Sequence, residues 1–150
     1  MPQSLAAIYI HLIFSTKDRH PYITEDARKE LHPYLAEICN QIGCPATKVG
    51  GVEDHVHILF RLSRTTSLAA VIQEIKTSSS KWIKAKWNYT KDFTWQGGYA
   101  AYSISATDIG DVVRYIESQV EHHKKVTFQD EVRKVLNEAG IEFDEQYLWD

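Results

Sequence analysis

Apolar and polar positions along this 150-residue chain follow two periods, which predict four strands and four helices. Short apolar runs bounded by turn residues are typical of strands. The predicted strands cover residues 7–14, 46–53, 55–62 and 99–106. Apolar residues that recur every three or four positions are typical of helices packed on a core. The predicted helices cover residues 24–43, 67–87, 107–125 and 129–140.

The order of the first six elements is strand, helix, strand, strand, helix, strand. This order predicts an α+β fold of the ferredoxin-like, or split βαβ, type: a four-stranded antiparallel sheet with two helices on one face. The other face is left free, and the last helix is able to cover part of it. We expect one domain over residues 1–150, with a core at about 7–125 and a helical tail at 126–150.

Composition and charge narrow the function classes. Apolar content of 43% and charged content of 25% are those of an ordinary globular protein. No run approaches the ~18 apolar residues of a membrane span. The net charge of −3 argues against a protein that coats nucleic acid non-specifically, because such binding rests on many phosphate contacts. A local basic patch remains compatible with this charge.

Two histidines stand two apart in the third predicted strand, in the segment EDHVHILFRL. Since side chains alternate across a strand, His55 and His57 point to the same side, about 6.5–7 Å apart. Both can therefore reach one divalent cation. The competing interpretation is a pair of half-buried histidines on an exposed sheet face, which is the commoner case for an isolated His-x-His. Asp54 either orients one imidazole or is simply a turn carboxylate.

The predicted helix 107–125 adds polar groups that fit such a site. Tyr115 and Gln119 lie one turn apart, and His122 or His123 continues the same side. An adjacent apolar stripe would dock the helix: Ile109, Val113, Ile116 and Val120. Taken singly, Tyr115 is better explained by packing and Gln119 by solvation. Together with the histidine pair they form a three-part combination, which is much less likely to arise by chance and so favours a catalytic site.

Lysines alternate with tryptophans in the segment KTSSSKWIKAKW of the second predicted helix. Lysines hold phosphates and indoles stack on unpaired bases, which predicts contact with single-stranded DNA. An equally good interpretation is a solvated helix face with its tryptophans in the core. The candidate DNA contacts are Lys76, Lys81, Lys84 and Lys86, with Lys124, Lys125 and Arg19 outside this helix.

The chain resembles the single-tyrosine members of the HUH endonuclease superfamily, namely the small insertion-sequence transposases and the REP-associated tyrosine transposases. The segments that carry the resemblance are HLIFSTKDRHPYI, VGGVEDHVHILF, FTWQGGYAAYSIS and VRYIESQVEHH. Together they cover most of residues 8–125. The pairing of HVH with YIESQ in this order and distance is its most specific element.

This resemblance implies a mechanism and a site. It implies that His55 and His57 bind Mg²⁺ or Mn²⁺, that Gln119 is a third ligand, and that Tyr115 is the nucleophile. The implied activity is transposition of single-stranded DNA with hairpin ends, through a 5′-phosphotyrosine. The implied assembly is a homodimer in which Tyr115 completes the site of the same subunit or of its partner. The implied location is the cytoplasm of a bacterial or archaeal cell, at the nucleoid.

Two other functions fit parts of the sequence. One is a non-catalytic ferredoxin-like module that reads single-stranded nucleic acid on an open sheet face. The other is a metal-dependent phosphodiesterase for small substrates, which would turn over without a tyrosine adduct. A covalent DNA–protein adduct distinguishes the transposase from both.

Overall fold

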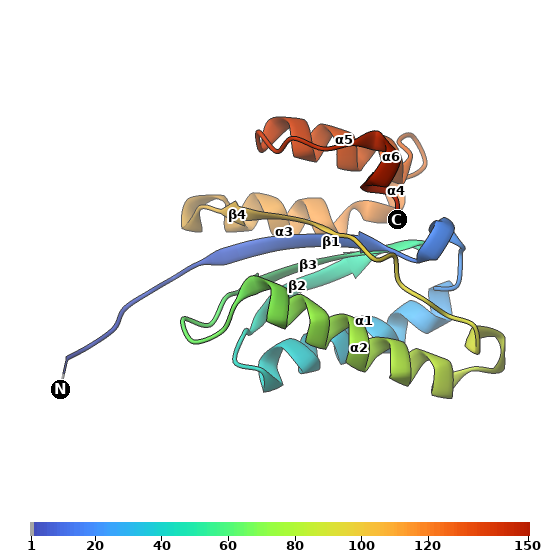
Figure 1. Ribbon diagram of the computed structural model, residues 1–150, viewed down its shortest axis with the longest axis horizontal. Helices are drawn as coiled ribbons and strands as arrows, with labels where there is room; N and C mark the ends of the chain where they lie inside the picture. The colour runs from blue at the N-terminus through green and yellow to red at the C-terminus, as the bar shows by residue number, and fades with distance from the viewer. Residues whose placement is uncertain (1) are drawn as a thin grey trace.

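The computed structural model describes residues 2–150 as an antiparallel sheet with helices on both faces (Figure 1). The strands are β1 (Tyr9–Ser15), β2 (Ala46–Gly51), β3 (His55–Arg61) and β4 (Ala100–Ile104). Their order across the sheet is β2-β3-β1-β4, and every neighbouring pair is antiparallel. The ferredoxin-like α+β fold predicted from the sequence is confirmed.

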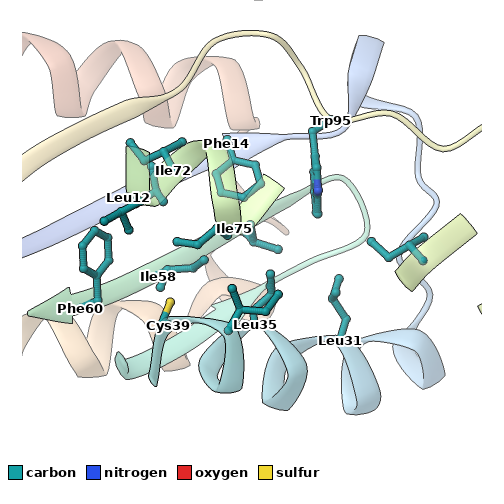
Figure 2. Packing of buried hydrophobic residues seen from close by; sticks show 14 of the residues in the cluster. Leu12, Phe14, Leu31, Leu35, Cys39, Ile58, Phe60, Ile72, Ile75 and Trp95 are labelled. Atoms are coloured by element: carbon teal, nitrogen blue, oxygen red, sulfur yellow. The ribbon is translucent and has the colours of Figure 1, made fainter. Parts of the chain in front are cut away.

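Two long helices cover one face of the sheet: α1 (Glu25–Gln41) and α2 (Leu68–Lys86). Each begins at a hydroxyl that accepts a hydrogen bond from a backbone N–H of the first turn: Thr24 from Ala27, and Ser67 from Ala70. Their apolar stripes pack on the strand residues that face them, as Figure 2 shows for Leu12, Phe14, Ile58 and Phe60. This is the main hydrophobic core.

The second face is covered by the C-terminal half of the chain. Its helices are α3 (Ile109–Glu117), α4 (Gln119–His122), α5 (Phe128–Glu138) and α6 (Glu145–Leu148). Helix α5 packs its apolar side on Ile13 and Ala100 of the sheet. Phe128 and Val132 are among the residues of this apolar side. The prediction that the last helix covers part of this face is confirmed. Because helices cover both faces, six of the seven residues of β3 are buried, and the expectation of an exposed face is wrong there.

Three short 3-10 turns complete the secondary structure: η1 (Lys17–Arg19), η2 (Asn88–Thr90) and η3 (Ala106–Asp108). None of the helices within residues 2–150 is long and apolar enough to cross a membrane.

The predicted single helix 107–125 is broken at Ser118, between α3 and α4. Ser118 leaves the helical conformation, with φ −91° and ψ 12°. The break turns Gln119 inward, where its side chain is buried, and leaves Val120 49% exposed. The predicted docking stripe is therefore wrong at Val120, whereas Ile116 is buried as expected.

Helix α3 lies close to the edge strand β2 because Gly50 has no side chain. A Cβ built on Gly50 would lie 2.6 Å from Cγ2 of Ile116 and 2.8 Å from its carbonyl oxygen. Any larger residue would push α3 outward. This close contact fixes the helix that carries Tyr115 against the strand next to β3.

Candidate active site

The two histidines of β3 lie on the face that α4 and α5 cover. His57 is paired with Ile13 of β1 and Gly50 of β2, which places its imidazole beneath the C-terminal helices. Both His55 and His57 are fully buried. The prediction that both side chains share one side of the strand is confirmed, but that side is buried beneath α4 and α5 and contacts their polar side chains.

The centre of this site is Glu131, from the first turn of α5. Its Oε1 lies 3.2 Å from Nε2 of His57, 3.4 Å from Nε2 of His55 and 3.1 Å from Nε2 of His123. Burial alone would raise the pKa of this carboxyl. The imidazoles of His123, His55 and His57 outweigh burial and hold the pKa well below its usual range. Glu131 is therefore a buried carboxylate anion held by histidines.

The predicted ligand Gln119 joins the same group. Its Oε1 lies 3.2 Å from Nε2 of His55 and 2.9 Å from Nε2 of His123. Its amide Nε2 donates to Oε2 of Glu131 over 3.1 Å. The helix break at Ser118 is what aims this amide at the histidines.

Tyr115 reaches the site from α3 of the same chain. Its hydroxyl donates a hydrogen bond to Oε2 of Glu131, and its ring centroid lies 5.7 Å from that of His57. Burial, followed by the negative charge of Glu131, raises the pKa of this phenol well above its usual range. A phenol in this environment keeps its proton until a base removes it.

Asp54 contacts the outer nitrogen of His55, with 2.7 Å between Oδ1 and Nδ1. Of the two interpretations left open by the sequence, the geometry favours the orienting carboxylate. Burial by itself would lower the pKa of His55, but Asp54 and Glu131 raise it to about 9. For His57, burial outweighs Glu131 and lowers the pKa to about 4.

Sequence reasoning missed His11 and Tyr102. His11 of β1 stands directly opposite Tyr102 of β4, and its Nδ1 lies 2.6 Å from the Tyr102 hydroxyl. Its Nε2 lies 2.8 Å from Nδ1 of His57. Burial, and then the neighbouring His57, lower the pKa of His11 to about 3, so the ring is neutral. The only signal in the sequence was a single histidine in an apolar strand. Its contacts with Tyr102 and His57 depend on which strands pair with β1, and the local sequence does not give that pairing.

The residues present fit a divalent cation. The ligand atoms of His55, His57, His123 and Glu131 lie within 4.8 Å of one another. Nitrogen and carboxylate ligands together suit Mn²⁺ and similar ions. This cluster could hold a divalent metal, and it adds His123 and Glu131 to the predicted set.

The hydrogen bonds of two imidazoles support this fit. Nδ1 of His123 lies 2.7 Å from the carbonyl of Val126, which only accepts, so Nδ1 carries the proton. Nε2 of His123 then faces two acceptor oxygens, of Gln119 and Glu131. His55 is placed likewise, with Asp54 on Nδ1 and the same two oxygens near Nε2. Either a second proton on each ring or a shared cation satisfies this arrangement.

The predicted DNA-contacting lysines lie outside this cluster, and several are occupied. Lys86 pairs with Glu30 at 3.1 Å, and Lys124 with Glu121 at 2.9 Å. The ammonium of Lys76 donates to backbone carbonyls of residues 96–98. Lys81, Lys84 and Lys125 are exposed.

Arg19 and the tryptophans of α2 have structural partners. Arg19 donates to the carbonyl of Trp149 over 2.9 Å, and so helps to hold the end of the described chain. Trp82 stacks on Tyr34 with 4.5 Å between centroids, and Trp87 packs edge-on against Trp82. Both indoles are partly buried against the main core, which favours the core interpretation, while DNA contact by the lysines stays a prediction.

Comparisons with known proteins agree with this architecture. The family model described as "Transposase IS200 like" matches residues 4–119. A crystal structure of a candidate transposase from Deinococcus radiodurans R1 is similar, with a TM-score of 0.62 and 21% identity over 79% of this chain and 98% of that one. A REP-associated tyrosine transposase solved bound to a REP hairpin has a TM-score of 0.61 and 15% identity over 96% of this chain and 90% of that one. No curated protein sequence matches the chain.

Proposed function

This chain belongs to the IS200-like transposase family, whose members are HUH single-tyrosine enzymes, and from that premise we propose that it cleaves and rejoins single-stranded DNA through Tyr115. One observation carries the proposal: the hydroxyl of Tyr115 and the imidazoles of His55 and His57 meet at the two oxygens of one carboxylate, Glu131. A nucleophile, a proton acceptor and a candidate cation site are thus adjacent within one chain.

In the proposed cleavage step, Oη of Tyr115 attacks a phosphodiester phosphorus. A bond forms between Oη and phosphorus while the bond from phosphorus to the 3′-oxygen breaks, which leaves a 5′-phosphotyrosine and a free 3′-hydroxyl. As the bond to phosphorus forms, Oε2 of Glu131 takes the phenolic proton through its hydrogen bond to Oη, and water protonates the departing 3′-oxygen. In the reverse step a 3′-hydroxyl of another strand attacks the phosphotyrosine and gives its proton to water. The bond from phosphorus to Oη breaks, and Glu131 returns its proton to Oη. The adduct conserves the bond energy, so rejoining needs no ATP.

We propose that His55, His57 and Gln119 hold Mg²⁺ or Mn²⁺, with Glu131 and His123 as further ligands. Mn²⁺ suits imidazole better than Mg²⁺ does. When bound, such an ion withdraws charge from the scissile phosphate. Asp54 and His11 would orient the imidazoles through their outer nitrogens, as partners of metal ligands commonly do.

The proposed substrate is single-stranded DNA with hairpin ends. The relative of similar fold that was solved with a REP hairpin supports this choice, since it aligns with 96% of this chain. The non-catalytic module that would read nucleic acid on an open sheet has less support, because α5 covers the face on which His57 and His11 lie.

We further propose a homodimer. In this chain the ring of Tyr115 lies 5.7 Å from that of its own His57, which supports an arrangement of the site in cis within such a dimer. Exchange of α3 and α4 between subunits would require hinges in the segments that flank this pair, before Ile109 and after His122. Light scattering at low micromolar concentration should give the mass of a dimer, and a monomer mass at every concentration would contradict this part of the proposal.

The central experiment uses labelled single-stranded oligonucleotides that tile the DNA on both sides of the gene. With Mn²⁺ or Mg²⁺, the wild-type protein should form a covalent adduct that resists denaturing electrophoresis. Tyr115→Phe should form none. Tyr147→Phe, which changes a 62% exposed tyrosine, is the matched control and should react normally. An adduct that persists in Tyr115→Phe would assign the nucleophile to another residue.

A further inference from the structure

A groove of about 540 Å³ lies between α2 and the segment of residues 95–99. Residues that matter to its chemistry include Lys76, Thr77, Lys81, Lys84, Trp95 and Tyr99. No carboxylate is among the residues that line it, although the chain carries 20 acidic residues against 17 basic ones. In a protein of net negative charge, this groove is a locally cationic surface.

The groove is separate from the histidine cluster. Helix α2 packs on the face of the sheet that presents Leu12 and Phe14, whereas His55 and His57 face α4 and α5. Trp95, which is among the residues that line the groove, belongs to the main core beside Phe14 (Figure 2). The proposed catalytic chemistry therefore uses none of the residues of this groove.

Fixed contacts hold the far wall of the groove in place. The ammonium of Lys76 donates to the carbonyls of Gln96 and Gly98 over 2.8 and 2.7 Å. The indole N–H of Trp95 donates to the hydroxyl of Ser79 over 2.9 Å. The wall is thus preformed, and Lys76 is one of its structural parts.

The groups of the groove that are free to bind a ligand belong to Lys81, Lys84 and Tyr99. Within residues 2–150, neither Lys81 nor Lys84 forms an ion pair, and both are exposed. They lie one helical turn apart, so their ammonium groups are neighbours on one side of α2. Tyr99 as a whole residue is 44% exposed, and the Lys76 ammonium lies 5.8 Å from the centroid of its ring.

We propose that this groove binds unpaired nucleotides of single-stranded DNA, with Lys81 and Lys84 on successive phosphates and Tyr99 stacked on a base. The inference rests on the proposed function for its choice of polymer and identifies a second contact surface on the other side of the sheet. Two unpaired lysines supply the charge that phosphates need, and a partly exposed aromatic ring supplies a sequence-tolerant platform. The hydroxyl of Thr77, one turn before Lys81 on α2, adds a hydrogen-bond donor to the lining.

The test measures binding without catalysis. Tyr115→Phe protein in EDTA is titrated with a fluorescent oligothymidylate, which forms no hairpin, at several salt concentrations. The double variant Lys81→Ala with Lys84→Ala should bind at least tenfold more weakly. Its slope of log affinity against log salt should fall by about 1.4, which is about 0.7 for each phosphate lost. Lys29→Ala, on the neighbouring helix α1 and paired with Asp26, is the matched control and should change affinity by less than about twofold.

Tyr99 is tested by a pair of substitutions in the same background. Tyr99→Ala should weaken binding by roughly fivefold or more, and Tyr99→Trp should restore it. The inference is overturned if the protein with an unaltered groove binds no oligothymidylate, or if the Lys81/Lys84 double variant binds as Lys29→Ala does. It is also overturned if binding of a blunt duplex of equal length depends on Tyr99 to the same extent. These outcomes are independent of the adduct assay, because neither metal nor a covalent link is required.

Discussion

The hydroxyl of Tyr115 is hydrogen-bonded to Glu131, a residue of another helix sixteen positions later in the chain. The other oxygen of the same carboxylate lies within 3.4 Å of three imidazole nitrogens. Glu131 therefore connects the candidate nucleophile to the candidate cation site.

We predict that Glu131→Gln slows adduct formation by roughly a hundredfold or more, because the amide cannot take the phenolic proton. Single-turnover kinetics with labelled oligonucleotide measure this rate. Glu138→Gln, which removes an exposed carboxylate from the same helix, should leave it unchanged. Adduct formation at an equal or higher rate in Glu131→Gln would mean that the carboxylate merely occupies the site.

We predict that His11→Ala weakens Mn²⁺ binding by about 10–100-fold, because His57 then loses the partner that orients its Nδ1. Calorimetric titration with Mn²⁺ alone measures the affinity without DNA. His11→Asn, which keeps a polar partner, should recover part of it. His20→Ala, which removes an exposed histidine, should have no effect. Unchanged affinity in His11→Ala would limit His11 to a packing role.

We predict that Mn²⁺ raises the melting temperature. At a hundredfold excess over Kd, binding to the folded state adds about 2.7 kcal/mol, or roughly 5–10 °C for a chain of this size. Differential scanning fluorimetry with and without EDTA measures the shift. His57→Ala should lose the shift and His20→Ala should keep it. A shift that survives in His57→Ala would place the ion elsewhere.

We predict that the metal-free protein loses stability in acid partly through His32. Burial, followed by the positive charges of Arg28 and Lys48, lowers the pKa of His32 from 6.5 to about 4. The unfolded chain therefore binds more protons between these values, so this contribution is present above pH 6.5 and is lost as the pH falls to 4. The difference between 6.5 and about 4 corresponds to at most about 3.4 kcal/mol of unfolding free energy.

The measurement is urea unfolding from pH 7 to 4 for wild type and His32→Gln. The variant should lose less free energy of unfolding over this range, while both should behave alike above pH 7. Parallel curves for the two proteins would show that His32 does not contribute to the acid sensitivity.

Local pattern determined a large part of the site. Alternation along residues 55–62 is enough to place His55 and His57 on one side, since every strand presents successive side chains to opposite faces. Helical spacing is likewise enough to group Tyr115 with Gln119. Element order gave the ferredoxin-like sheet, because few topologies connect such elements without crossing.

Tertiary packing decided the rest. From the local sequence, Glu131 looks like an ordinary acidic residue in the first turn of a solvated helix. Only the packing of α5 on the sheet through Phe128 and Val132 buries it among the imidazoles. His11 meets His57 through the pairing of β1 with β3, and Tyr102 through the pairing of β1 with β4. These contacts join residues 46 to 91 positions apart, and such pairings depend on register and burial that no local window contains. The sequence alone therefore determined which side chains of this protein are able to act as nucleophile, ligand or base. The tertiary structure decided which of those side chains are in contact.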